Sequence, residues 1–167
     1  MLIQKSFELK INLNVKNDFG LTAFNFACIK GQTKIAKMLL QKSTEYEIET
    51  DSAQHVLRRS DFHLVCENGH SDTVKMLLME SPKFNFDVNA KDMHGKIPFH
   101  LACLNGKYDV AEIIIEESNK LKIDLNAKDN FGYTAFHWAC KIGHLNVVKL
   151  LMHKSTKFNI QLNVKDG

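Results

Sequence analysis

The chain contains 167 residues, of which 44% are hydrophobic and 25% are charged, and its formal net charge is +3. This composition is typical of a folded domain and excludes a chain that is disordered by composition. Basic and acidic residues are interspersed, so we expect no nucleic-acid partner. Because the sequence shows no signal peptide and no apolar stretch that could span a bilayer, we expect an intracellular protein, cytoplasmic or nuclear, without membrane insertion.

An internal repeat organises the sequence. The four cysteines lie 38, 37 and 37 residues apart, and a glycine follows each of them by three residues. On number alone, four cysteines could form disulfides or a metal site. Such even spacing is instead typical of a repeated structural unit, and serines keep the same period. The cysteines are Cys28, Cys66, Cys103 and Cys140, and the serines are Ser6, Ser43, Ser81, Ser118 and Ser155.

The predicted elements follow one order in every copy. A turn precedes a short helix that starts near a threonine, serine or isoleucine, and most of these turns contain glycine. This helix ends near the glycine after the cysteine, because glycine readily adopts the left-handed conformation at a helix C-terminus. An amphipathic second helix follows. In chain order, the expected helices cover residues 22–30, 32–41, 60–68, 70–79, 97–105, 107–117, 134–142 and 144–153.

After the repeated serine, apolar residues alternate with polar ones. Alternation with a period of two predicts a half-buried strand or an extended arm. The unit is therefore expected to be helix, turn, helix, and an arm that leads into a hairpin. The alternating sets are Leu9, Ile11 and Leu13; Phe84, Phe86 and Val88; Leu121, Ile123 and Leu125; and Phe158, Ile160 and Leu162.

This unit resembles the ankyrin repeat. The Thr-Pro-Leu-His-x-Ala signature of that family is matched by Ile-Pro-Phe-His-Leu-Ala at 97–102 and by Thr-Ala-Phe-His-Trp-Ala at 134–139. The family's Gly-His before the second helix is matched at 69–70 and 143–144. The resemblance implies an all-α repeat solenoid whose helix-turn-helix units are joined by extended β-hairpin loops. Ankyrin units usually have about 33 residues, and we expect the extra residues here to lengthen the hairpin arms.

The repeat also predicts the domain organisation. We expect one domain, with units at about 1–37, 38–75, 76–112 and 113–149 and a partial unit at 150–167. Neither end resembles a capping repeat, so the chain is expected to be a fragment of a longer array. The second hairpin, at 49–59, lacks the usual glycine and contains one inserted residue, so it is expected to be irregular.

Cofactor chemistry and catalysis are not expected. Matching positions of adjacent repeats lie roughly 8–10 Å apart, which is too far for a disulfide. No unit contains a Cys-x-x-Cys pair for zinc. We therefore expect four reduced, buried and poorly reactive cysteines, no metal and no other cofactor. The resemblance implies structural hydrogen bonds for His63, His100 and His137. Phosphate-loop, nucleophile-elbow and zinc-helix motifs are absent, so we expect no enzyme.

The resemblance implies that a partner binds on the concave surface made by hairpin tips and first helices. Apolar and aromatic side chains at tips have no core to fill, and aromatic residues and arginine are enriched at binding hot spots. The alternative is that these rings pack against neighbouring tips. Basic tip residues would permit an acidic peptide. The candidate binding residues are Phe19, Leu21, Arg58, Arg59, Met93, His94, Lys96, Phe131, Tyr133 and Trp138.

The expected function is that of a monomeric scaffold or adaptor module that binds a protein partner. The alternative is a regulatory or targeting array of a larger polypeptide, such as an enzyme, a channel or a ligase adaptor, whose active part lies outside these residues.

Overall fold

The computed structural model describes residues 12–46, 59–84 and 86–162. In these residues it contains eight α-helices and no strand, which confirms the predicted all-α repeat solenoid. None of the helices found there is long and apolar enough to cross a membrane. The helices are α2 (Ala23–Ile29), α3 (Thr33–Tyr46), α4 (Asp61–Asn68), α5 (Ser71–Phe84), α6 (Pro98–Leu104), α7 (Tyr108–Leu121), α8 (Ala135–Ile142) and α9 (Leu145–Phe158).

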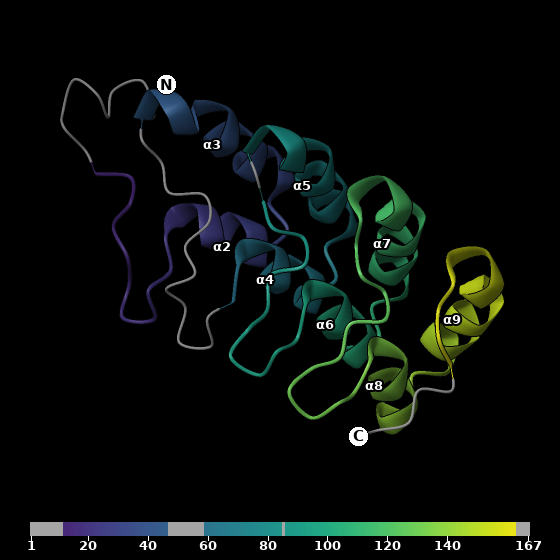
Figure 1. Cartoon of the computed structure of the whole chain (residues 1–167). Coiled ribbons are helices and arrows are strands. Elements are labelled where there is room, and N and C mark those ends of the chain that lie inside the picture. Colours follow the sequence, from purple (N-terminus) through teal and green to yellow (C-terminus); the bar gives the residue numbers. More distant parts are fainter. Residues whose placement is uncertain (1–11, 47–58, 85, 163–167) are drawn as a thin grey trace.

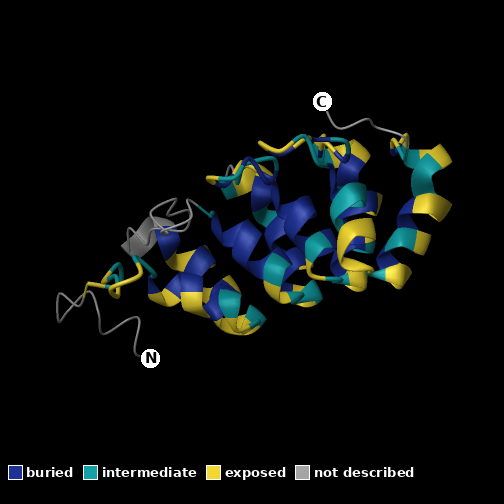
Figure 2. Cartoon of the chain, turned by 90° about the horizontal axis from the view of Figure 1, so that it is seen from below, coloured by how far each residue is buried: buried dark blue, intermediate teal, exposed yellow. Residues whose placement is uncertain are grey.

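The helices form two layers (Figure 1). The short first helices α2, α4, α6 and α8 lie side by side, and the longer second helices α3, α5, α7 and α9 form the other layer. The loops between units project beyond the first helices, away from the second layer. Each helix contacts its counterpart in the adjacent unit. The stack therefore buries a continuous core between units, and Figure 2 shows buried residues gathered in its middle.

Local hydrogen bonds define the short helices. Before α8, the Thr134 hydroxyl accepts from the His137 N–H (3.5 Å), and His137 Nδ1 accepts from the Thr134 N–H (3.1 Å). Thr22 and Asn25 make the equivalent pair before α2. Helix α8 ends at Gly143, whose φ of 87° lies in the left-handed region that disfavours other residues. These signals act within a few residues, so the helix starts follow directly from the sequence.

Buried histidines tie units together. His63 Nε2 donates to the Lys96 carbonyl (2.8 Å), and His100 Nε2 donates to the Tyr133 carbonyl (3.1 Å). In both rings Nδ1 accepts a backbone N–H, which leaves the proton on Nε2. Burial lowers the pKa of both histidines. The rings are thus neutral structural links, as the resemblance implied.

The first unit uses a different pair in this position. Asn25 replaces the histidine, and its Oδ1 accepts from the Thr22 N–H (2.6 Å). Its Nδ2 donates to the carboxylate of Asp61, at the start of α4. The next hairpin, whose expected irregularity falls on residues 47–58, lies outside the described residues. The Asn25–Asp61 pair therefore links the two first helices directly.

The second helices are longer than predicted. They end at Phe84, Leu121 and Phe158, where the sequence predicted alternating extended arms. The strand alternative is thus wrong for these described units, and the helices continue for another turn where longer arms were expected. In these units only the first residue of each alternating set lies in a helix. The other two follow in non-helical chain, where Val88, Ile123, Leu125 and Ile160 are buried. The repeated serine lies inside the helix and does not end it: the Ser118 hydroxyl donates to the Ile115 carbonyl (2.7 Å) within α7.

Asparagines hold the chain after α7 and after α9. Helix α7 is followed by Lys122, which has a φ of 54°. Asn89 Nδ2 donates to the Lys122 carbonyl (2.9 Å), and Asn89 Oδ1 accepts from the Asp124 N–H (2.9 Å). Asn126 makes the same two bonds to the Asn159 carbonyl and to a backbone N–H two residues later. The repeated asparagine thus stabilises the left-handed helix end of the following unit.

The cysteines are not all alike. Cys28, Cys66 and Cys103 are buried and free, as predicted. Cys140 is exposed, so the prediction of four buried thiols is wrong at this position. Cys140 belongs to α8, the last short helix among the described residues, and no described helix packs on its outer side. Position in the stack therefore decides its exposure.

Candidate partner-binding surface

An acidic residue shapes the tip of each of the two later hairpins. Asp129 Oδ1 accepts from the backbone N–H groups of Phe131 (2.9 Å) and Tyr133 (3.0 Å). Asp92 Oδ1 accepts in the same way from His94 and Lys96, both at 2.9 Å. In the first hairpin Asn17 has this role towards Phe19 and Leu21. The three hairpins therefore share one turn conformation, which positions the side chains at their tips.

Neighbouring tips are hydrogen-bonded to each other. The Asn130 N–H donates to the His94 carbonyl (3.0 Å), and Asn130 Nδ2 donates to the Met93 carbonyl (3.3 Å). The contact is close, because a Cβ on Gly95 would lie 2.2 Å from Asn130 Oδ1. The two later tips therefore form one continuous surface rather than two independent loops.

Some of the predicted binding residues are exposed at these tips. Phe131 is 61% exposed and Met93 is 48% exposed. Phe19 is 63% exposed, but it lies on the first hairpin, and the intervening hairpin falls outside the described residues (Figure 1). Arg58 also lies outside them. The structure thus brings the two later tips together, whereas Phe19 belongs to a separate tip.

Aromatic rings and lysines cluster beside the last tip. The rings of Tyr133 and Trp138 meet edge to face, with centroids 5.3 Å apart. Lys141 Nζ lies 4.8 Å from the Tyr133 centroid and 4.9 Å from that of Trp138. Lys96 Nζ lies 4.6 Å from the Trp138 centroid and 5.4 Å from that of Phe131. At such distances a lysine is attracted to the ring face, and the cluster holds its own rings in place.

Lys96 lies inside this cluster and is only 6% exposed. Its Nζ lies 3.3 Å from Asp129 Oδ2, and the same carboxylate oxygen accepts from Trp138 Nε1 (2.9 Å). The sequence indicated a solvent-facing charge at this position, but the structure shows a buried ion pair. Lys96 therefore packs against the rings of Phe131 and Trp138 from within the protein. Its charge is paired with Asp129 and is not available to a partner.

The Asp129 carboxylate is held in its ionised form. Burial alone would raise its pKa, but hydrogen bonds from the Trp138 indole, from the backbone N–H groups of Tyr133 and Phe131 and from Lys96 outweigh that effect. The net result is a lowered pKa. The ion pair with Lys96 therefore persists at neutral pH.

Arg59 is also engaged within the protein. Its Nη1 lies 2.6 Å from Glu67 Oε2, and its Nε lies 3.5 Å from Asp92 Oδ2. Its side chain is 13% exposed. It links Glu67 of α4 to Asp92 on the following hairpin. Its charge is therefore already balanced.

We define the tip surface as Met93, Phe131, Tyr133, Trp138 and Lys141. Sequence reasoning found the four apolar members of this set but missed Lys141, and it also missed Asp129 beneath them. The register of Asp129 with Asp92 and Asn17 was a readable signal for a turn residue. Among the described residues, no group of three or more His, Cys, Asp or Glu side chains is placed to hold a metal ion.

The comparisons with known proteins agree with the repeat architecture. A family model described as ankyrin repeats, in three copies, matches residues 1–92 and again residues 62–166. Together these matches span nearly the whole chain. No curated protein matches it.

Proposed function

Because the chain belongs to the ankyrin-repeat family, whose members are generally protein–protein interaction modules, we propose that it binds a protein partner through the tip surface. Domains of this family are typically non-catalytic, and we infer that this chain is a monomeric scaffold or adaptor module within the cell. The observation that carries the proposal is Phe131, which is 61% exposed on a tip that hydrogen bonds hold in place.

A fixed, exposed aromatic ring suits an interface. Binding usually costs free energy because side chains lose rotational freedom, and a ring that is already held loses less. Phe131 and Met93 provide apolar area, and Tyr133 and Trp138 provide adjacent ring edges. Lys141 is exposed beside these rings and can meet a carboxylate. We therefore infer a partner segment with an apolar anchor next to an acidic residue.

Affinity capture followed by mass spectrometry tests the proposal with two variants. Phe131→Ala should lose the specifically captured partner, because removing an anchor costs about 2 kcal/mol or more of binding free energy. Its melting temperature should change by no more than about 1–2 °C, since an exposed residue contributes roughly 0.5 kcal/mol or less to stability. Met79→Ala is the matched control, because Met79 is 78% exposed on α5, far from the tips.

Two outcomes would contradict the proposal. If Phe131→Ala captures the partner as well as the wild type does, the tip surface is not the binding site. If it melts several degrees lower, the ring is structural. Tyr133→Ala should weaken both binding and stability, because Tyr133 packs against Trp138, and it is therefore unsuited as the deciding variant.

A further inference from the structure

The turns after α4 and α6 share a chemically labile sequence. In both, an asparagine directly precedes the glycine near the helix end, and Asn68–Gly69 and Asn105–Gly106 are the only Asn-Gly pairs of the sequence. The matching positions in the first and fourth units are Lys30 and Ile142. Asparagine is a thermolabile residue. A following glycine, which has no side chain, leaves its conversion least hindered.

The reaction at such a pair needs no other reactant than water. The backbone nitrogen of the glycine bonds to the side-chain carbonyl carbon of the asparagine. The carbon–nitrogen bond of the side-chain amide breaks, and ammonia leaves with the proton of the glycine N–H. Water then opens the cyclic imide and yields aspartate or isoaspartate. The glycine nitrogen must therefore come within bonding distance of the asparagine side chain.

After α4, hydrogen bonds hold the two reacting groups apart. The Gly69 N–H donates to the Val65 carbonyl (3.0 Å), and Asn68 Nδ2 donates to the Leu64 carbonyl (2.7 Å). The next unit covers this turn, because a Cβ on Gly69 would lie 2.7 Å from Cδ of Lys107. The glycine nitrogen is therefore not free to turn towards the asparagine side chain while these units are stacked.

The turn after α6 is held in a similar way. Asn105 Nδ2 donates to the Leu101 carbonyl (2.9 Å), and the Gly106 N–H donates to a carbonyl of α6 (3.3 Å). The covering residue is His144, whose Nδ1 would lie 2.6 Å from a Cβ on Gly106. His144 Nε2 also donates to the Leu104 carbonyl (2.9 Å). At both turns a side chain of the following unit thus keeps the labile pair in place.

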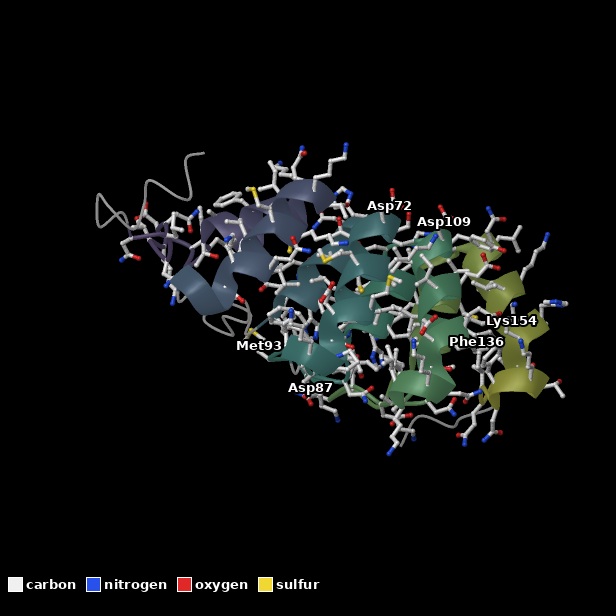
Figure 3. All side chains as sticks on the ribbon, turned by 90° about the horizontal axis from the view of Figure 1, so that it is seen from above. Asp72, Asp87, Met93, Asp109, Phe136 and Lys154 are labelled. Carbon is white, nitrogen blue, oxygen red and sulfur yellow. The ribbon has the colours of Figure 1, made fainter. Side chains whose placement is uncertain are left out.

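From this arrangement we propose that Asn68 and Asn105 are latent deamidation sites, which the stack protects while it is folded and which react once α4 or α6 opens. Folded proteins open locally in this way. The two sites lie just before Asp72 and Asp109, which are labelled in Figure 3 on the first turns of α5 and α7. Neither site belongs to the tip surface.

Deamidation changes the helix end at which it occurs. Each product places a carboxylate near the C-terminus of a short helix, where the helix dipole disfavours negative charge. The product also lacks the side-chain amide that bonds the preceding helical turn. Because the reaction is irreversible, the protein keeps a record of each opening, and a converted unit is less stable than before.

Peptide mapping by mass spectrometry, on the intact chain kept at mildly alkaline pH, measures the conversion of each asparagine over time. In guanidinium chloride both sites should convert at least about tenfold faster than in the folded protein, because unfolding removes the need for a rare local opening. Asn146 is exposed and precedes a valine, so it is the internal control. It should stay largely unconverted under both conditions, since the β-branched neighbour hinders ring closure.

The variant His144→Ala tests whether the following unit provides the protection. It should speed conversion of Asn105 in the folded protein at least about threefold, because the turn after α6 then opens more often. Asn68, which Lys107 covers, should keep its wild-type rate in the same sample. Asn105→Lys should remove the converted form of its own peptide and leave Asn68 unchanged. This variant should fold, because a lysine occupies the matching position in the first unit.

The inference is overturned if either asparagine converts as fast in the folded protein as in the denaturant, or if neither converts in the denaturant. It is also overturned if His144→Ala leaves the rate at Asn105 unchanged. Equal acceleration of both sites by this variant would overturn it as well, because the protection would then come from global stability and not from the covering unit.

Discussion

The buried ammonium of Lys96 determines which groups the tip surface can offer a partner. Its charge is balanced by Asp129, and its position below Trp138 and Phe131 supports both rings. Removing one member of a buried charged pair typically costs about 3–5 kcal/mol. A loss of binding in a Lys96 variant would therefore report unfolding of the tip rather than a lost contact. Phe131 and Lys141 are the residues whose substitution reports on binding.

Among the cysteines, only the thiol of Cys140 is expected to react with a reagent in the folded protein. Cys28, Cys66 and Cys103 are buried, and burial raises their pKa values. Partial burial also raises the pKa of Cys140, so its modification should be slow at neutral pH and faster at pH 9, where more thiolate is present. Intact-mass spectrometry over time should show one added label.

The Cys140→Ser variant is the control, and it should take up no label until denaturant is added. Rapid native labelling of Cys103 would contradict the burial of the inner thiols and, with it, the packing between α6 and α8.

At the scale of single elements, the ends of the long second helices are the unusual feature. Lys122 terminates α7 in the left-handed conformation, which costs a residue with a Cβ roughly 1–2 kcal/mol. The segment accepts this strain because Asn89 bonds the Lys122 carbonyl and the Asp124 N–H. Asn89 makes both bonds to backbone groups, so they do not depend on the side chain of Lys122.

Lys122→Gly should therefore stabilise the protein by up to about 1 kcal/mol, after allowance for the greater freedom of glycine in the unfolded chain. Urea unfolding of the variant and of the wild type measures the difference. Lys75→Gly, in the middle of α5 and also exposed, should instead cost about 0.5–1 kcal/mol. A loss of stability in both variants would mean that the left-handed end is not strained.

At the scale of the whole molecule, the repeated histidines make stability depend on pH. Burial lowers the pKa values of His63 and His100 in the folded state, whereas an unfolded histidine titrates near about 6.5. Below that pH the unfolded chain binds more protons than the folded chain. The free energy of unfolding should thus be fully retained above about pH 6.5 and should decrease as the pH falls towards 5.

Chemical unfolding at pH 7.5, 6.5, 5.8 and 5 checks this prediction. His100→Gln should flatten the decrease, since an amide does not titrate and Asn25 shows that an amide can occupy this position. Stability that rises or stays constant between pH 7.5 and 5 would contradict neutral, buried rings.

The sequence by itself determined the period, the family resemblance and the starts of the helices. These features rest on local chemistry, such as Thr134 and His137 three residues apart or a glycine after each cysteine, which recurs in every copy. It also named Phe131, Tyr133 and Trp138 as candidate binding residues. The alternation after the serines did not locate the end of the second helix, because α5 continues to Phe84, the first residue of its alternating set.

Only the tertiary structure decided which side chains are available. Lys96 is buried because the next unit places Asp129 and Trp138 against it, 33 and 42 residues further along the chain. Cys140 repeats Cys103 in sequence, yet it is exposed because no described helix packs on its outer side. Burial in a stacked repeat is set by the neighbouring unit, and a pattern within one unit does not contain that information.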